Sequence, residues 1–390
     1  MLNKQKQLEV LQSGGAFSKK TALKRLLFAE KIGVEQIPTV KQIAPMHFAT
    51  NKYYSLYTPT MCAYHAHRSG CFAVGVNDYA SLQYGKEFIN ACKILKIPYV
   101  CGYHVECEPL FNEQRAMLYA YGISDYYLPF IDKELQGERE RKKKDVQAVI
   151  TALNVKLNDY GIFISDDILT DKNYSAINEK HVGKILSEKL IEKFGKGEEL
   201  LKFLEEVLLV KDCQCELPFL KEKENAYFEE DLAKVLYTRC ALIRRRISPS
   251  KVEKFVNINS AYGAISSYKL SVDTIKSLGV NKIANVLKSK NINAVTIKSE
   301  TLKENEDLVS EFLSEGILVV DLYRAGLPRQ ILPFNDRSEL AFKSALALIG
   351  NAVSTSHHVK DGLFGENTLE KCPSFQLRLE LFANVGRRGR

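Results

Sequence analysis

The sequence lacks the long apolar run that a membrane-spanning helix needs. No segment approaches the roughly 18 apolar residues of a span, and residues 1–15, MLNKQKQLEVLQSGG, are polar where a secretory signal peptide would be apolar. The sequence therefore predicts a cytoplasmic protein with no membrane as a partner.

A large excess of one charge is also lacking. The chain carries 55 Lys and Arg against 47 Asp and Glu, which leaves +8 over 390 residues. Proteins that bind nucleic acid usually concentrate a larger surplus, so the sequence argues against nucleic acid as a partner. With 45% hydrophobic residues, 22 Gly and 11 Pro, the composition excludes disordered, collagen-like and low-complexity chains.

Three frequent catalytic or phosphate-binding motifs are missing as well. The sequence contains no GxGxxG, no GxxxxGK[ST] and no GxSxG, the patterns of dinucleotide, P-loop and serine-hydrolase sites. Its nine cysteines are an odd number scattered through apolar segments, which indicates buried reduced thiols rather than a disulfide framework.

What is present, near the start of the chain, is a pattern of alternating strands and helices. The first 35 residues are expected to be helical, and a short strand is expected at 43–48. Strand 72–76, helix 81–96 and strand 98–105 then fit a βαβ unit of about 30 residues. Such a crossover predicts that the two strands are parallel.

The middle of the chain has a helical pattern without strands, and the α/β alternation returns after it. Residues 112–260 are expected to form long charged amphipathic helices, with Gly195 and Gly197 separating two of them. Beyond residue 260, a helix at 273–289 precedes an expected strand at 293–297. A helix at 304–315, a strand at 317–323 and a helix at 338–350 follow.

The simplest architecture is one α/β body built from both ends of the chain and interrupted by helices. We expect an N-terminal helical segment (1–40), two barrel-forming parts (41–111 and 261–370), a helical insertion between them (112–260) and a C-terminal tail (371–390).

Polar side chains occur where several of the expected strands end. They are His47, Asp78, His104 and Asp321. In parallel α/β folds such positions gather at one edge of the sheet. Imidazole and carboxylate groups bind divalent ions that acidify water, so this set is typical of a hydrolytic metal centre. The alternative is that each side chain only caps a loop or a helix.

Several segments also resemble a known family. HFATNKYYSLYTP, AVGVNDYASLQYGKEF and IPYVCGYHVEC resemble the opening motifs of PHP (polymerase and histidinol phosphatase) domains, in a group with a helical insertion. INEKHVGKILSEKLIEKFGKGEEL, INAVTI, GLPRQ and ALALIGN resemble the same group in the same order. The resemblance implies an α/β fold, a distorted (β/α)7 TIM-like barrel with a long α-helical insertion. It also implies phosphoester hydrolysis at a cluster of up to three divalent metals.

Most of the metal ligands that the resemblance implies are replaced in this chain. The family's His-x-His stands here as His47 followed by Phe and Ala, and its Asp-His-Asp as Asp78 followed by Tyr and Ala. Its Gly-x-Glu ends here in His104. Arg324 stands where an acidic pair or an Asp-x-His is expected, and Asn351 stands where the family has a histidine.

These replacements predict a degenerate metal site. Two divalent ions about 3.5–4 Å apart need bridging carboxylates to offset their repulsion, and exchanging Glu for His removes a negative charge. A site for one ion, Zn, Mn or Mg, held by His47, Asp78 and His104 is the remaining expectation. The alternative is that no metal binds.

Cations follow the later strands at the same expected edge. Lys298 comes after strand 293–297, and Arg324 and Arg329 come after strand 317–323. Guanidinium and ammonium groups bind phosphate, so these three residues are candidate phosphate ligands. The alternative is that they are ordinary exposed cations.

Two functions of different classes follow from the sequence. The first is a divergent metal-dependent phosphoesterase that hydrolyses a small phosphorylated substrate at a reduced metal site. The second is a catalytically inactive homologue that binds a phosphorylated ligand or a partner protein. The sequence assigns neither the substrate nor the oligomeric state.

Overall fold

A computed structural model describes most of the chain. The described residues are 3–40, 43–52, 55, 57–113, 116–171, 174–210, 224–225, 227–243, 249–298, 302, 305–322, 344–345, 347–349 and 351. The chain divides into two compact units. The first combines Met1–Leu135 with Pro249–Arg390, and the second is Gln136–Ser248.

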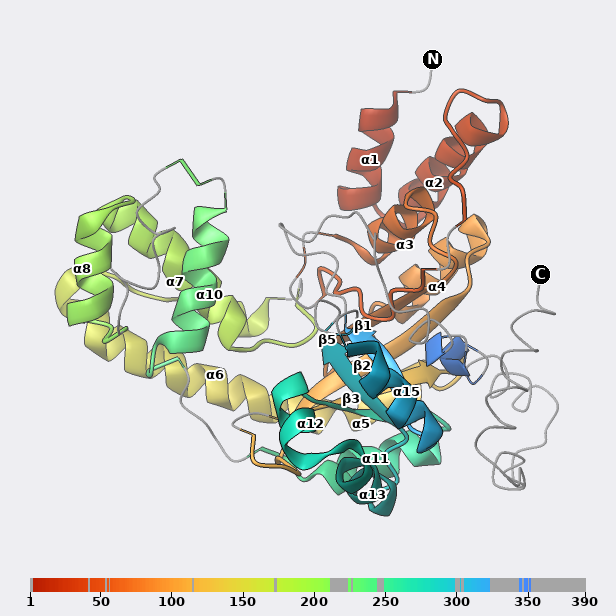
Figure 1. Ribbon diagram of the computed structural model, residues 1–390. Coiled ribbons are helices and arrows are strands. Elements are labelled where there is room, and N and C mark those ends of the chain that lie inside the picture. The colour runs from red at the N-terminus through yellow and green to blue at the C-terminus, as the bar shows by residue number, and fades with distance from the viewer. Residues whose placement is uncertain are drawn as a thin grey trace. The chain divides into compact units, whose positions relative to one another are not determined.

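Figure 1 shows the sheet of the first unit. It is a six-stranded mixed sheet whose spatial order follows the chain. Its strands are β1 (Val74–Tyr79), β2 (Tyr99–Cys107), β3 (Ala116–Ile123), β4 (Ile265–Lys269), β5 (Ala294–Lys298) and β6 (Leu318–Leu322). β3 is antiparallel to both neighbours, and the other adjacent pairs are parallel. The described strands form a curled half barrel. Closure into a complete (β/α)7 barrel stays a prediction.

Helices precede, connect or follow the strands of this unit. They are α3 (Pro59–Arg68), α4 (Gly85–Leu95), α5 (Leu128–Glu134), α11 (Val252–Ala261), α12 (Val272–Leu278), α13 (Val280–Ser289) and α15 (Glu306–Ser314). The predicted parallel βαβ unit is confirmed as β1, α4 and β2. The single helix expected at 273–289 is instead α12 and α13, because Gly279 adopts a φ of +79° that breaks the helix between them.

Two strands, β3 and β4, were not predicted from the sequence. β3 reads AMLYAYGI and lies in the segment expected to be helical. A short apolar run of this kind has no periodicity that separates a buried strand from a buried helix. β4, ISSYK, is only five residues long and half polar. Together these two strands join the two ends of the chain into one sheet.

The expected strand at 43–48 is reduced to one bridge with β1. Phe48 pairs with Val76, the Phe48 amide donates to the Gly75 carbonyl at 2.8 Å, and the Asn77 amide donates to the Phe48 carbonyl at 2.9 Å. A Cβ at Gly75 would lie 2.7 Å from the backbone of Met46. Glycine at this position therefore lets the segment run directly against β1.

β2 and β3 are joined through a β-bulge. Cys101 pairs with Ile123 and Tyr103 with Ala120, so Gly102 faces two residues of β3. The surplus residue, Gly122, has a φ of +70°, as a bulge glycine in the left-handed region does. The bulge therefore bends β3 at the point where it passes Gly102.

Before the sheet, the chain forms two helices, α1 (Lys4–Ser13) and α2 (Ala16–Lys31). The expected apolar stripe of α2 is confirmed, since Leu23, Leu26 and Ala29 are buried. α2 packs against α1 and α4.

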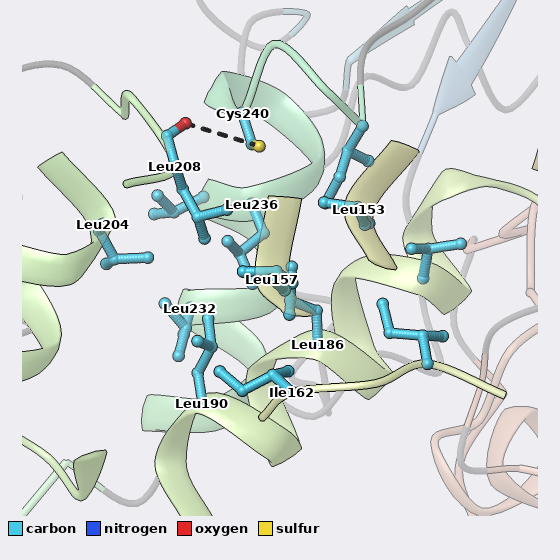
Figure 2. Packing of buried hydrophobic residues seen from close by; sticks show 14 of the residues in the cluster. Leu153, Leu157, Ile162, Leu186, Leu190, Leu204, Leu208, Leu232, Leu236 and Cys240 are labelled. Atoms are coloured by element: carbon cyan, nitrogen blue, oxygen red, sulfur yellow. Dashed lines mark hydrogen bonds between the residues drawn. The ribbon is translucent and has the colours of Figure 1, made fainter. Parts of the chain in front are cut away.

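The second unit is a helical body with its own apolar core. Its elements are α6 (Gln136–Leu157), two 3-10 turns (Asn158–Tyr160 and Asp166–Thr170), α7 (Glu179–Phe194), α8 (Glu198–Glu206) and α10 (Phe228–Arg239). Figure 2 shows leucines of these helices packed together, with Cys240 contacting the Leu208 carbonyl. Gly195 and Gly197 separate α7 from α8 as expected, with φ of +68° and +132°.

Across both units, no helix of the described ranges is long and apolar enough to cross a membrane.

We expect Gly102→Ala to destabilise the first unit strongly. The new Cβ would lie 2.1 Å from the Ala120 carbonyl oxygen and 2.8 Å from Asn77 Nδ2. Overpacking of this kind costs about 3 kcal/mol at the upper end of its range. Urea unfolding should show this loss, whereas Gly137→Ala, where a Cβ meets nothing within 4 Å, should leave stability near the wild-type value. Equal stability of the two variants would contradict the close packing of β2 on β3.

Candidate functional site

The register of the first three strands places five residues on one face of the sheet. Asn77 pairs with Gly102 and Tyr79 with His104 between β1 and β2, while His104 pairs with Tyr119 between β2 and β3. Successive side chains of a strand alternate between faces, so paired residues and their i+2 neighbours share a face. We call this the inner face of the sheet.

Two imidazoles and two phenol rings pack together on the inner face. The ring centroids of His47 and His104 are 5.2 Å apart, and both side chains are buried. Tyr119 stacks on His104 at 5.3 Å with an interplanar angle of 23°, and Tyr79 meets His104 edge-on at 5.7 Å. These contacts hold the two imidazoles in fixed positions.

The side-chain amide of Asn77 determines how His104 is oriented. Asn77 Nδ2 donates to the carbonyls of Tyr103 and Ala120, each at 3.2 Å. The amide oxygen must therefore be the group that faces His104 Nδ1, at 2.8 Å. Because an amide oxygen only accepts, Nδ1 carries the proton, and in the neutral ring Nε2 is the acceptor nitrogen.

Asp78 lies on the opposite face of the sheet. It is adjacent to Asn77 in β1, and it pairs with Tyr103 rather than with His104. Its carboxylate accepts from the Thr50 amide at 2.8 Å and from the Thr50 hydroxyl at 2.5 Å. The field of Asp78 also acts on Cys62 of α3, on the helix-covered side. Asp78 is therefore separated from the two imidazoles by the sheet itself.

Burial dominates the ionisation of Asp78. The side chain is fully buried, and desolvation raises its pKa to about 7, against the opposing effect of the two hydrogen bonds from Thr50. A carboxyl group in this environment spends much of the neutral pH range protonated.

The described residues do not fit the expected ion site. Within the described ranges, no group of three His, Cys, Asp or Glu side chains could hold a metal ion. His47 and His104 supply two neighbouring nitrogen donors, but Asp78 faces away from them. The expectation that these three residues share one ion stays a prediction, which the register does not favour because Asp78 alternates with Asn77 and lies on the other face.

Two lysines lie on the inner face toward the end of the parallel strands. Ser267 pairs with Tyr119 on one side and with Ala294 on the other, so all three belong to the inner face. Lys269 and Lys298 follow Ser267 and Ala294 by even steps and share that face. Lys298 is exposed and Lys269 is half-buried. Arg324 and Arg329, the other two candidate phosphate ligands, lie outside the described residues.

Asp321 and Glu106, two further acidic residues near strand ends, lie on different faces. Asp321 pairs with Ile297, which places it on the opposite face from Lys298. Glu106 follows His104 by two residues in β2, so it lies on the inner face, and it is half-buried. Asn351 donates its Nδ2 to the Gly122 carbonyl at 3.2 Å and to the Gly263 carbonyl at 2.7 Å, which supports the bulge.

The sequence analysis missed three residues of this site. Asn77 directly precedes Asp78, and the register of β1 with β2, which the sequence does not provide, assigns it to the face of His104. Tyr119 and Lys269 belong to β3 and β4, the two strands that were not predicted. No local pattern identified these strands, because β3 is a short apolar run and β4 is five residues long and half polar.

We expect Asp78→Asn to remove a pH dependence of stability. A carboxyl pKa raised from 3.8 to about 7 stabilises the fold fully below pH 4, and this contribution is lost as the pH rises through 7. Relative to Asp78→Asn, the wild-type free energy of unfolding should fall by on the order of 4 kcal/mol across that interval. Denaturant unfolding at several pH values measures this fall in the free energy of unfolding. Asp159 is exposed, so Asp159→Asn should keep the wild-type dependence of unfolding free energy on pH. If wild type and Asp78→Asn show the same dependence, the raised pKa of the buried Asp78 carboxyl is refuted.

Solved structures share this fold at low sequence identity. An amidohydrolase from Chromobacterium violaceum, with bound sulfate and no metal, is 12% identical with a TM-score of 0.51, over 74% of this chain and 89% of that chain. A protein from Bifidobacterium adolescentis assigned as a metal-dependent phosphoesterase is 12% identical with a TM-score of 0.52, over 80% and 97%. The chain matches no protein-family model and no curated protein. At this identity the likeness shows the α/β fold, which is consistent with that of PHP domains.

Proposed function

We propose that this chain binds a small phosphorylated molecule at the inner face of the sheet, with Lys269 and Lys298 contacting the phosphate. The observation that carries the proposal is the division of charge between the two faces. Asp78 is turned to the helix-covered face, while both lysines share the face of the two imidazoles. With Glu106 as the acidic side chain assigned to this face, the two lysines favour an anion over a cluster of divalent cations.

The positions of the charged residues suggest the chemistry of the ligand. The two lysines belong to β4 and β5, and Glu106 belongs to β2 on the same face. Adjacent strands are about 4.8 Å apart, so Glu106 and Lys269 are separated by roughly 10 Å. A ligand that spans this distance would place its phosphate at the lysines. Its other end would donate to Glu106 from a hydroxyl or amino group.

The structural neighbours support anion binding on this fold. The Chromobacterium violaceum amidohydrolase holds sulfate without metal, and sulfate resembles phosphate in charge and geometry. The Bifidobacterium adolescentis protein is assigned as a metal-dependent phosphoesterase, whose substrates carry a phosphate. Both support an anionic ligand for the present chain, and the second supports a relationship to hydrolases.

Hydrolysis of that ligand is the second candidate function, and the orientation of His104 favours it. The Asn77 amide fixes the proton on Nδ1, which leaves Nε2 as the nitrogen that accepts a proton. An imidazole held in this tautomer can act as a general base toward water. His47, 5.2 Å away, adds a second imidazole.

We expect inorganic phosphate to raise the melting temperature of the wild-type protein and not that of Lys269→Ala/Lys298→Ala. A ligand at ten times its Kd stabilises the folded state by about 1.4 kcal/mol. Thermal unfolding with phosphate, against chloride at matched ionic strength, measures this effect. Lys282→Ala, which removes an exposed lysine of α13, should respond like the wild type. A phosphate response in the double variant equal to the wild-type response would refute the assignment of the lysines.

Hydrolysis is tested with a generic aryl phosphate, with and without added Mn²⁺ or Zn²⁺, together with the metal content of protein purified without chelator. If the second function is present, His104→Ala should abolish turnover while phosphate still raises its melting temperature. Turnover that survives in His104→Ala would refute the role of this imidazole. Absence of turnover in the wild type under every condition would leave binding as the function.

A further inference from the structure

Helix α2 has a second face, directed to solvent, that carries aromatic side chains. Phe17 is 82% exposed and Phe28 is 61% exposed. Eleven residues separate them, which is three helical turns and a rotation of about 20° at roughly 100° per residue. Large aromatic groups are seldom left so open unless another surface covers them.

Basic side chains occupy the same face. Lys20, Lys24 and Lys31 are exposed and lie within about 60° of Phe17 around the helix axis. Arg25 is also exposed, at about 80° on the other side. We call the set of Phe17, Lys20, Lys24, Arg25, Phe28 and Lys31 the outer face of α2.

The outer face carries charge of one sign because the acidic residue of α2 is turned inward. Glu30 is 6% exposed and accepts from His67 Nε2 and Arg68 Nη1, each at 2.8 Å. Lys19 is also turned inward, where its Nζ lies 3.0 Å from the Glu87 carboxylate. The exposed charges that remain on α2 are cationic.

The loop that follows α2 extends this surface with aliphatic groups. Ile32, Val34, Ile37 and Val40 are between 56% and 71% exposed. The acidic residue of the loop, Glu35, is engaged by Lys4 at 2.7 Å. The loop therefore adds apolar side chains to the outer face without adding an uncompensated negative charge.

We propose that the outer face of α2, with the loop at 32–40, binds the surface of an anionic lipid bilayer. Surfaces that bind anionic membranes use Lys and Arg to attract the headgroups and exposed aromatic or aliphatic side chains to enter the acyl boundary. The lysines would contact lipid phosphates and carboxylates, and the two phenylalanines and the loop would enter the acyl boundary. We assign an anionic bilayer because the exposed charges of the outer face are cationic.

This surface mode differs from membrane spanning. The sequence and the described helices provide no span, and the proposed contact needs none, since α2 keeps its buried side against α1 and α4. The outer face shares no residue with Lys269, Lys298 or the imidazole pair. The proposal is therefore independent of the proposed function.

Vesicle flotation with the full chain tests the proposal. The wild-type protein should float with phosphatidylserine–phosphatidylcholine vesicles and not with pure phosphatidylcholine vesicles, and added salt should release it. Lys20→Gln/Lys24→Gln/Lys31→Gln should lower the partition coefficient about 100-fold, at roughly fivefold for each charge near the surface. Phe17→Ser/Phe28→Ser should also abolish flotation, because it removes the groups that enter the bilayer.

Two matched variants separate this surface from other effects. Phe163→Ser removes a side chain of the second unit that is 64% exposed and should float like the wild type. Lys269→Ala/Lys298→Ala should also float like the wild type, which distinguishes this surface from the proposed phosphate site. Circular dichroism should show every variant folded, because the α2 side chains that are changed are exposed.

The proposal is overturned if the wild type fails to float with anionic vesicles, or if the two α2 variants float like the wild type. It is equally overturned if the wild type is a dimer in solution that Phe17→Ser/Phe28→Ser converts to a monomer. The surface covering the outer face would then be a second copy of the chain.

Discussion

The site depends on one side-chain amide that reaches across a glycine. Asn77 belongs to β1, yet its Nδ2 donates to a carbonyl of β2 and to the Ala120 carbonyl of β3. This reach is available because Gly102, the residue of β2 that lies between, has no side chain. The same amide then presents its oxygen to His104. One polar group thus joins three strands and sets the tautomer of the imidazole, so that strand packing and site chemistry are fixed by the same contacts.

Strand alternation gives the two faces of the sheet different chemistry. Neighbouring residues of β1, Asn77 and Asp78, serve opposite sides: the first orients an imidazole, and the second is a buried carboxyl held by Thr50. A carboxylate beside the imidazoles would favour a cation there. On the far side it leaves the inner face to the aromatic and imidazole rings, to the two lysines and to Glu106. The sequence resembles a metal-dependent family, yet the described residues contain no set of side chains that fits a metal ion. The two observations are compatible, because a fold can persist when the side chains that bind metal are replaced.

The sequence predicts local elements better than the pairings between distant ones. The βαβ unit, the helix break at Gly195 and Gly197 and the apolar stripe of α2 follow from periodicity and breakers, which act over a few residues. Leu118 of β3 pairs with Tyr268 of β4, 150 residues later in the chain, and no local pattern indicated either strand. His47 and His104 were identified correctly as neighbours in the fold. A strand end identifies an edge of the sheet and not a face, so the sequence could not assign Asp78 to either side, and its grouping with the imidazoles stays a prediction.

The bulge at Gly122 has a consequence for the shape of the sheet. β3 is one residue longer here than its pairing with β2 requires, and a surplus residue on one strand bends that strand. Without Gly122, β3 would still offer Tyr121 to Gly102 and Ile123 to Cys101 in a regular ladder. It would then run straighter past β2, and the concave side that gathers the imidazoles would open. The local bend of β3 is thus set by the length of the chain, through one extra residue that has no side chain.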